Sequence, residues 1–176
     1  MADFTISIAK TLQYEGGYSN NPNDPGGETY LGWSRANHPN DPVWLMIDKA
    51  KAIPNFPMNL NNDPAIKAAI VQSYKSDYWD KMQGDSITNQ AIADSLFDYA
   101  VNAGVSTSVA MAQMALDIPS DGIFGSQTLQ TINSANAETF LAAFSLAKIV
   151  RYVGIVKSRP TSQQFFYGWV KRTLNL

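Results

Sequence analysis

The chain has 176 residues, of which 45% are hydrophobic and 16% charged, so it can bury one core and is not expected to be disordered. The formal net charge of −2, with no run of Lys or Arg, argues against a nucleic-acid partner and against an electrostatically bound membrane surface. The absence of cysteine excludes disulfide bonds and thiolate chemistry.

The pattern of capping, apolar and turn residues predicts a mainly α fold. A first helix capped by Asp3 should run to about Tyr14 or Glu15 and end in a left-handed cap at Gly16-Gly17. A long polar loop, with room for a small hairpin, is expected over residues 16–41. The other helices are predicted at about 41–53, 64–82 (capped by Asp63 and started by Pro64), 89–102, 106–116, 126–134, 136–158 and 162–173.

Two kinds of segment are not expected in this sequence. No stretch approaches the ~18 consecutive apolar residues of a membrane-spanning helix. The N-terminal sequence has neither the basic region nor the unbroken apolar region of a secretory signal peptide. We therefore expect synthesis in the cytoplasm, without membrane insertion.

Glu15 is the first candidate for catalysis. At 100° per residue it shares one helix face with Phe4, Ile8 and Thr11, at the C-terminal end of the expected buried stripe. Burial and the negative pole of the helix would both raise the pKa of this carboxyl group. A carboxylic acid that stays protonated near neutral pH can act as a general acid, and the glycine pair after it leaves room for a ligand.

Asp24 is a second carboxylate, separated from Glu15 by eight residues. Taken alone, a Glu before Gly-Gly is an ordinary helix end, and Asn-Asp-Pro-Gly-Gly is an ordinary turn. Together with the nearby aromatic residues Tyr30 and Trp33, the two acids are typical of glycosidic bond cleavage. We expect the carboxyl groups to lie roughly 6.5–9.5 Å apart, with Asp24 holding a water, rather than the about 5–5.5 Å of a covalent nucleophile.

The segment "EGGYSNNPNDPGGETYLGW", residues 15–33, resembles the EGGY motif of phage and prophage N-acetylmuramidases, the lysozyme-like glycoside hydrolase family 108. The matching residues are Glu15, Gly16, Gly17, Tyr18, Asp24, Pro25, Gly26, Gly27, Thr29 and Gly32. Thr29 follows Asp24 one residue sooner than the corresponding threonine of other phage lysozymes. Glu28 and Trp33 depart from the family pattern, in which a small and an aliphatic residue are usual.

The resemblance continues beyond the motif. "FDYAVNAG", residues 97–104, is similar to a family helix beside the cleft, and "AQMALDIPSDGIFGSQTL" and "FFYGWVKR" resemble the family's predicted peptidoglycan-binding region. It implies a lysozyme-like helical fold with a catalytic region at 1–87 and a binding region at 88–176, packed as one globular unit. Tyr18, Tyr30, Trp33, Asp98 and Asn102 would contact the sugar. From the residues alone, Asp98 and Asn102 could equally lie on a solvated helix face.

The resulting prediction is an endolysin-type muramidase that cuts the β-1,4 bond between N-acetylmuramic acid and N-acetylglucosamine. Glu15 would protonate the leaving oxygen, while Asp24, with Thr29, places water or stabilises the transition state. The alternatives are a lytic transglycosylase that uses Glu15 alone and a non-catalytic wall-binding or secretion-associated module. The expected partner is the peptidoglycan glycan strand, reached through a holin or another route. We expect a monomer with no cofactor, and no metal site at the single histidine, His38.

Overall fold

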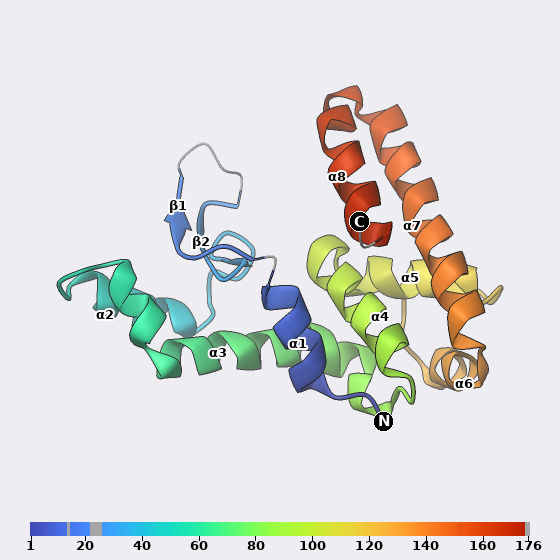
Figure 1. Ribbon diagram of the computed structural model, residues 1–176, viewed down its shortest axis with the longest axis horizontal. Coiled ribbons are helices and arrows are strands. Elements are labelled where there is room, and N and C mark those ends of the chain that lie inside the picture. Colours follow the sequence, from blue (N-terminus) through green and yellow to red (C-terminus); the bar gives the residue numbers. More distant parts are fainter. Residues whose placement is uncertain (14, 22–25, 175–176) are drawn as a thin grey trace. The chain divides into compact units, whose positions relative to one another are not determined.

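The structure is a computed structural model that describes residues 1–13, 15–21 and 26–174 (Figure 1). The fold is mainly helical, as predicted, with eight α-helices and one small sheet in the part of the chain described. Contacts divide the chain into two compact units. The N-terminal unit is Phe4–Asp80, and the C-terminal unit is Lys81–Leu176 together with Met1–Asp3.

The N-terminal unit surrounds a small sheet with helices. Its three short strands form an antiparallel meander in the order β1-β2-β3, in which Tyr30 is the register partner of Trp33. The elements are α1 (Phe4–Leu12), β1 (Ser19–Asn20), β2 (Glu28–Tyr30), β3 (Trp33–Ser34), α2 (Val43–Lys51), η1 (Met58–Asn62), α3 (Pro64–Tyr74) and η2 (Lys75–Trp79), with η3 (Asp80–Met82) at the boundary.

Helix α1 ends earlier than predicted. Its buried residues are Phe4, Ser7, Ile8 and Thr11, so the expected apolar face is present, but the helix stops at Leu12. Glu15 lies beyond it, and its N–H donates to the Leu12 carbonyl in a turn (3.2 Å). Gly16 and Gly17 are not among the residues with positive φ, so the predicted left-handed cap is wrong. The chain unwinds at this point and continues into β1.

Helix α3 begins as predicted and changes character before its expected end. The side chain of Asp63 caps it by accepting from the N–H groups of Ala65 and Ile66. Helical structure runs to Met82, as predicted, but the α-helix itself ends at Tyr74 and continues as a π-helical turn, η2, and then the 3-10 turn η3. A π turn bonds residues five apart and so brings Tyr74 and Trp79, both at most 1% exposed, to the same buried side.

The C-terminal unit is a helical bundle, and its helices lie close to their predicted positions. Figure 1 shows α7 and α8 as an antiparallel hairpin. Leu96, Phe97, Val109 and Phe144 are fully buried in its core. The elements are η4 (Gly84–Ser86), α4 (Gln90–Ala103), α5 (Val105–Ala115), α6 (Ser126–Ser134), α7 (Ala137–Ser158), η5 (Pro160–Ser162) and α8 (Gln163–Leu174).

A buried glutamine fixes the loop between α5 and α6. The Gln113 amide donates to Asp121 Oδ1 (2.8 Å) and to the Ile123 carbonyl (3.1 Å), and its carbonyl oxygen accepts from the Gly122 N–H (2.9 Å). Gly122 adopts φ +72°, a conformation that favours glycine. The Asp-Gly sequence is thus the centre of an ordered turn.

Helix α7 differs from the expectation that no segment approaches the properties of a membrane span. It has 22 residues, an 18-residue window of mean hydropathy 1.6, and only 17% of that window buried. One such helix is weak evidence for a span, because helices of other kinds meet the same criterion. Leu146, Val150 and Val153 are exposed along it.

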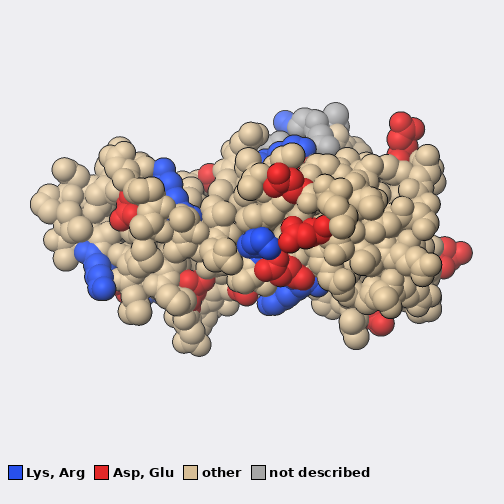
Figure 2. Space-filling view, turned by 90° about the horizontal axis from the view of Figure 1, so that it is seen from below, with Lys and Arg blue, Asp and Glu red and all other residues tan. Residues whose placement is uncertain are grey.

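On the face of the molecule seen in Figure 2, charged side chains are scattered over a mostly uncharged surface.

Candidate active site

The carboxyl group of Glu15 lies directly against the turn between β2 and β3. A Cβ atom placed on Gly32 would lie 2.4 Å from Glu15 Oε2, 2.6 Å from its Cδ and 2.9 Å from its Cγ. The acid therefore occupies space that any other residue at position 32 would fill. Glu15 is half-buried in this position.

The turn that contacts Glu15 has an unusual backbone conformation. Leu31 (φ +50°) and Gly32 (φ +75°) both have positive φ and join the paired residues Tyr30 and Trp33. Two such residues make the tight hairpin turn that matches the twist of its strands. From α3, the buried Tyr74 hydroxyl donates to the Leu31 carbonyl (3.0 Å) and anchors the turn. From the sequence, Gly32 could be recognised only through the family motif, and no local signal pointed to Tyr74.

The glycine pair after Glu15 leaves open space. A Cβ atom on Gly16 or on Gly17 would have no heavy atom within 4 Å among the described residues. The predicted role of the pair in capping α1 does not hold, but its predicted openness is consistent with this geometry. Within the part of the chain that the structure describes, the space beside these two glycines is therefore open.

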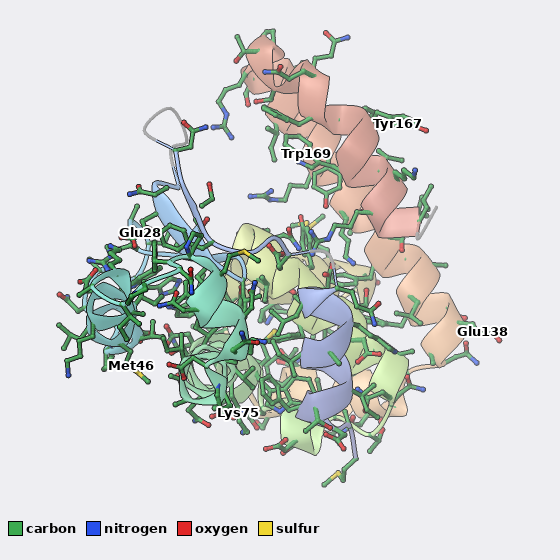
Figure 3. The ribbon with its side chains drawn as sticks, turned by 60° about the vertical axis from the view of Figure 1, so that its left-hand side comes forward. Glu28, Met46, Lys75, Glu138, Tyr167 and Trp169 are labelled. Atoms are coloured by element: carbon green, nitrogen blue, oxygen red, sulfur yellow. The ribbon has the colours of Figure 1, made fainter. Side chains whose placement is uncertain are left out.

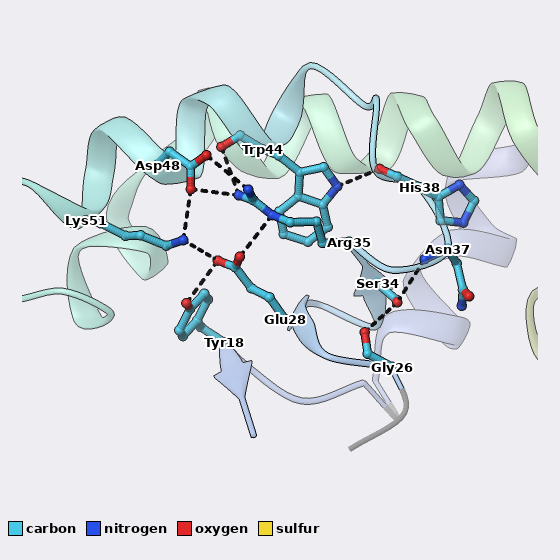
Figure 4. A network of polar contacts seen from close by, with 10 residues as sticks. All are labelled: Tyr18, Gly26, Glu28, Ser34, Arg35, Asn37, His38, Trp44, Asp48 and Lys51. Carbon is cyan, nitrogen blue, oxygen red and sulfur yellow. Dashed lines mark hydrogen bonds and ion pairs between the residues drawn. The ribbon is translucent and has the colours of Figure 1, made fainter. Parts of the chain in front are cut away.

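Glu28, at the start of β2, is the centre of an ionic network whose other members are partly exposed (Figure 4). Its Oε2 lies 2.9 Å from Arg35 Nε and its Oε1 lies 2.7 Å from Lys51 Nζ, while the Tyr18 hydroxyl donates to Oε1 (2.9 Å). The Glu28 side chain is 9% exposed. Figure 3 also shows it at the sheet. With two cations and a phenol committed to it, Glu28 joins the sheet to α2 and is a structural carboxylate.

The same network perturbs the ionisation of its members. Hydrogen bonds from Arg35 and then from Lys51 lower the pKa of Asp48 to about 2, and Asp48 in turn raises the pKa of Arg35. Burial, followed by the hydrogen bond to Glu28, raises the pKa of Tyr18. The ion pair between Arg35 and Asp48 is therefore fully formed at neutral pH.

The three aromatic residues that were expected to contact the sugar are used in packing. Tyr30 is 0% exposed and donates its hydroxyl to the Leu60 carbonyl (3.0 Å). Trp33 is 1% exposed, and its ring stacks on His38 with centroids 3.8 Å apart. Neither ring presents a face to a glycan in the structure, because tertiary contacts cover both. Tyr18 is partly exposed, with its ring edge-on to Phe56 and its hydroxyl on Glu28.

Two further residues, Asp24 and Thr29, were predicted to take part in catalysis. Asp24 lies outside the described residues, so its expected distance from Glu15 stays a prediction. Thr29 lies in the middle of β2 and is partly buried, in register with Ser19 on β1 and Ser34 on β3. Its catalytic role also stays a prediction.

Asp98 and Asn102 belong to α4 in the C-terminal unit, whereas Glu15 belongs to the N-terminal unit. Asp98 forms a bidentate ion pair with Arg172 of α8, with Nη2–Oδ1 2.7 Å and Nε–Oδ2 3.3 Å. The side-chain amide of Asn102 donates to the Asp98 carbonyl (2.6 Å). That these residues border the same cleft as Glu15 stays a prediction.

His38 is held by aromatic and polar neighbours. Besides its stack on Trp33, its Nδ1 lies 3.3 Å from Asp77 Oδ2 and its Nε2 lies 3.4 Å from the Tyr78 hydroxyl. Within the described residues, no three His, Cys, Asp or Glu side chains are grouped so that they could hold a metal ion.

Comparison with known proteins gives two matches to family profiles. Residues 8–104 match glycosyl hydrolase 108, and residues 105–174 match a predicted peptidoglycan domain. The predicted boundary after residue 87 lies between this family boundary and the contact division after Asp80. No curated protein sequence matches the chain significantly.

A solved structure, that of SagA from Brucella abortus, has a similar fold. The TM-score is 0.69, over 98% of this chain and 90% of that one, at 23% sequence identity. This agreement supports the mainly α, lysozyme-like architecture. Since the glycosyl hydrolase profile alone spans more than half of the sequence, the chain belongs to the glycosyl hydrolase 108 family, as a peptidoglycan-cleaving muramidase with a C-terminal peptidoglycan domain.

Proposed function

We propose that Glu15 is the general acid of this muramidase and protonates the glycosidic oxygen between N-acetylmuramic acid and N-acetylglucosamine. The observation that carries this assignment is the close contact of the carboxyl group with Gly32. The turn at Gly32, with its two positive-φ residues, leaves space for this one side chain. A general acid must be held in a fixed position relative to the scissile bond. The open space beside Gly16 and Gly17 supports access of the glycan to Glu15.

Glu28 is a carboxylate on β2, and its contacts argue against a role in proton transfer. Both of its carboxylate oxygens are paired with Arg35 and Lys51 and it has little exposed surface, so it is not placed to reach a glycan. We assign the second catalytic carboxylate to Asp24, which would hold the attacking water with help from Thr29. The support is the match of both residues to the EGGY motif.

The experiment that tests this function is digestion of purified peptidoglycan followed by mass spectrometry of the products. A hydrolase leaves reducing N-acetylmuramic acid ends, and a lytic transglycosylase leaves 1,6-anhydro ends. Reducing ends from wild type, and their loss from Glu15→Gln, are expected. Anhydro ends, together with full activity of Asp24→Ala, would replace the two-carboxylate scheme by one in which Glu15 acts alone.

We further propose an endolysin-type, bacteriolytic role in which the protein is made in the cytoplasm and acts on the cell wall after holin-type or other release. The support is the resemblance of residues 15–33 to phage and prophage enzymes. Expression with and without a holin, followed by turbidity, tests it. Lysis that depends on the holin is expected, and lysis at the same rate without it would contradict this route.

A further inference from the structure

A cavity of about 400 Å³ lies within the C-terminal unit, between α4, α7, η5 and α8. Its size is typical of a small-ligand site. All of its lining residues belong to this one unit, so the cavity does not depend on the N-terminal unit that holds Glu15.

The cavity is cationic in a chain of net charge −2. Lys148, Arg151, Arg159 and Arg172 line it, against a single carboxylate, Asp98. Asp98 is committed to its bidentate pair with Arg172. Among the described residues, no carboxylate lies within ion-pair distance of the three other cations. A positive excess in a concave site attracts and orients anions.

Lys148 is the most unusual of these groups because it is only 5% exposed. Its ammonium donates to Ser95 Oγ (2.9 Å) and lies over the rings of Phe144 (4.2 Å to the centroid) and Tyr99 (5.1 Å). Burial lowers its pKa to about 8. A buried ammonium with one hydrogen-bond acceptor keeps donor capacity for an anion.

Tyr99 supplies a second, independent sign of a ligand. It lines the cavity at 2% exposure, and its buried hydroxyl oxygen makes no bond of hydrogen-bond geometry among the described residues, although the Arg151 and Tyr152 side chains are close enough to perturb its pKa. Burial raises its pKa to about 12, so the hydroxyl keeps its proton and is a donor. Buried polar groups are nearly always hydrogen-bonded, so an unpaired donor beside a cationic cavity is a site for an acceptor.

Aromatic side chains form the remaining wall. Trp169 of α8 lies over Tyr152 of α7 with ring centroids 5.2 Å apart, and both line the cavity with Phe165. Figure 3 shows Trp169 and Tyr167 on opposite sides of α8, and Tyr167 is 77% exposed. The cavity therefore combines donors for an anion with apolar surface for an aliphatic group.

We propose that this cavity binds a carboxylate of the short peptide that branches from the peptidoglycan glycan, with Lys148, Arg151 and the Tyr99 hydroxyl as its donors. The inference rests on the proposed function and deepens it, because it assigns recognition of the peptide to the C-terminal unit. A peptide branch offers carboxylates on an aliphatic backbone, which suits the donors and the aromatic wall together. A glycan strand without peptides offers the donors only the lactyl carboxylate, which is held directly on the sugar and has no aliphatic peptide backbone beside it.

The test is calorimetric titration of the full chain with a purified disaccharide-peptide and with the same disaccharide after an amidase has removed the peptide. We expect the peptide-bearing ligand to bind at least about 10-fold more tightly, as for hydrogen bonds to charged groups. Arg151→Gln should weaken its binding by at least about 10-fold. Lys157→Gln, which removes a charge from an exposed site on the same helix and outside the cavity, is the matched control.

Three outcomes would overturn the proposal. They are equal binding of the two ligands, unchanged binding by Arg151→Gln with a folded circular dichroism spectrum, and tighter binding of a glycerol-phosphate polymer than of the disaccharide-peptide. Wild-type cleavage of peptide-free glycan strands tests the muramidase function separately. Loss of that cleavage with intact peptide binding would defeat only the proposed function, and the reverse result would defeat only this inference.

Discussion

The carboxyl group of Glu15 and the Cα of Gly32 are in such close contact that a Cβ at position 32 would lie 2.4 Å from Glu15 Oε2. Two segments separated by the whole polar loop thus form a single small structure. The loop residues supply the motif, but the turn between β2 and β3 supplies the position of the acid.

Glu15→Gln should lower the rate of peptidoglycan cleavage by at least ~10²-fold, the usual scale for loss of a general acid. Gln has nearly the same shape, so the melting temperature should change little. Glu138→Gln is the control, because Glu138 is exposed at the start of α7. The rate is measured as reducing ends released from purified sacculi. Near-normal turnover by the Glu15→Gln protein would remove the catalytic assignment.

Gly32→Ala should reduce cleavage as severely, for a steric reason. The added methyl group would overlap Glu15, and φ +75° strains any residue with a Cβ. Gly154→Ala in α7 is the control, since a Cβ there meets no atom within 4 Å and the substitution should leave stability unchanged or higher. Activity and melting temperature are measured for both. A fully active Gly32→Ala protein would show that catalysis does not require the carboxyl group of Glu15 to lie against position 32.

The helices of this chain could be predicted from the sequence because their signals are local. Asp63-Pro64, Asn89 and Gly104 lie at the expected ends of α3 and α4. The extents of the other helices could be predicted from the periodic spacing of their apolar residues. The end of α1 could not be predicted in this way, because the contact between Glu15 and Gly32 depends on a sheet formed by later residues.

The candidate site could be predicted only in part, for the same reason. The sequence shows Glu28 as a departure from the family pattern. It does not show the ion pairs of Glu28, because its partners Arg35 and Lys51 come from the residue after β3 and from α2. Tyr30 and Trp33 were predicted to bind sugar because aromatic residues close to an acid pair are common in glycosidases. The local sequence does not indicate which aromatic rings the tertiary structure will bury.

Glu28→Gln should destabilise the N-terminal unit by about 1–3 kcal/mol, the cost of losing hydrogen bonds to charged groups. Asp48→Asn should cost less, about 0–1 kcal/mol, because the Asp48 side chain is 42% exposed whereas that of Glu28 is 9% exposed. Urea unfolding measures both. Activity per folded molecule should be retained in the Glu28→Gln protein. A loss of turnover at full stability would instead give Glu28 a catalytic role.

Tyr74→Phe removes the hydroxyl that anchors the turn through the Leu31 carbonyl. A buried hydrogen bond is worth about 1 kcal/mol, so a small loss of stability is expected. Because Tyr74 acts on Glu15 through the turn, it is a positioning residue, and kcat should fall by more than KM changes. Tyr78→Phe, on the same helical segment and not bonded to the turn, is the control. Equal kcat values for the two variants would show that the hydrogen bond from Tyr74 to Leu31 does not contribute to catalysis.

Lys148 predicts a specific dependence of stability on pH. Burial lowers its pKa from 10.5 to about 8 in the folded protein. Below pH 8 it is charged in both states, and the folded state carries the full cost of the buried ammonium. Between about pH 8 and 10 the folded protein releases this proton while the unfolded chain keeps it, so stability rises with pH.

The measurement is the free energy of unfolding of wild type minus that of Lys148→Met, at pH 7, 8, 9 and 10. Subtraction cancels the other titrating groups, and the nearby Tyr99, with a pKa of about 12, stays protonated throughout. Over the full interval to pH 10.5 the difference should shift in favour of wild type by about 3 kcal/mol, at 1.36 kcal/mol per pKa unit. Asp98, which raises this pKa, and Arg172, which lowers it, are present in both proteins. A difference that stayed constant from pH 7 to 10 would mean that the Lys148 ammonium is not desolvated, and the donor assigned to it in the cavity would then be an ordinary surface charge.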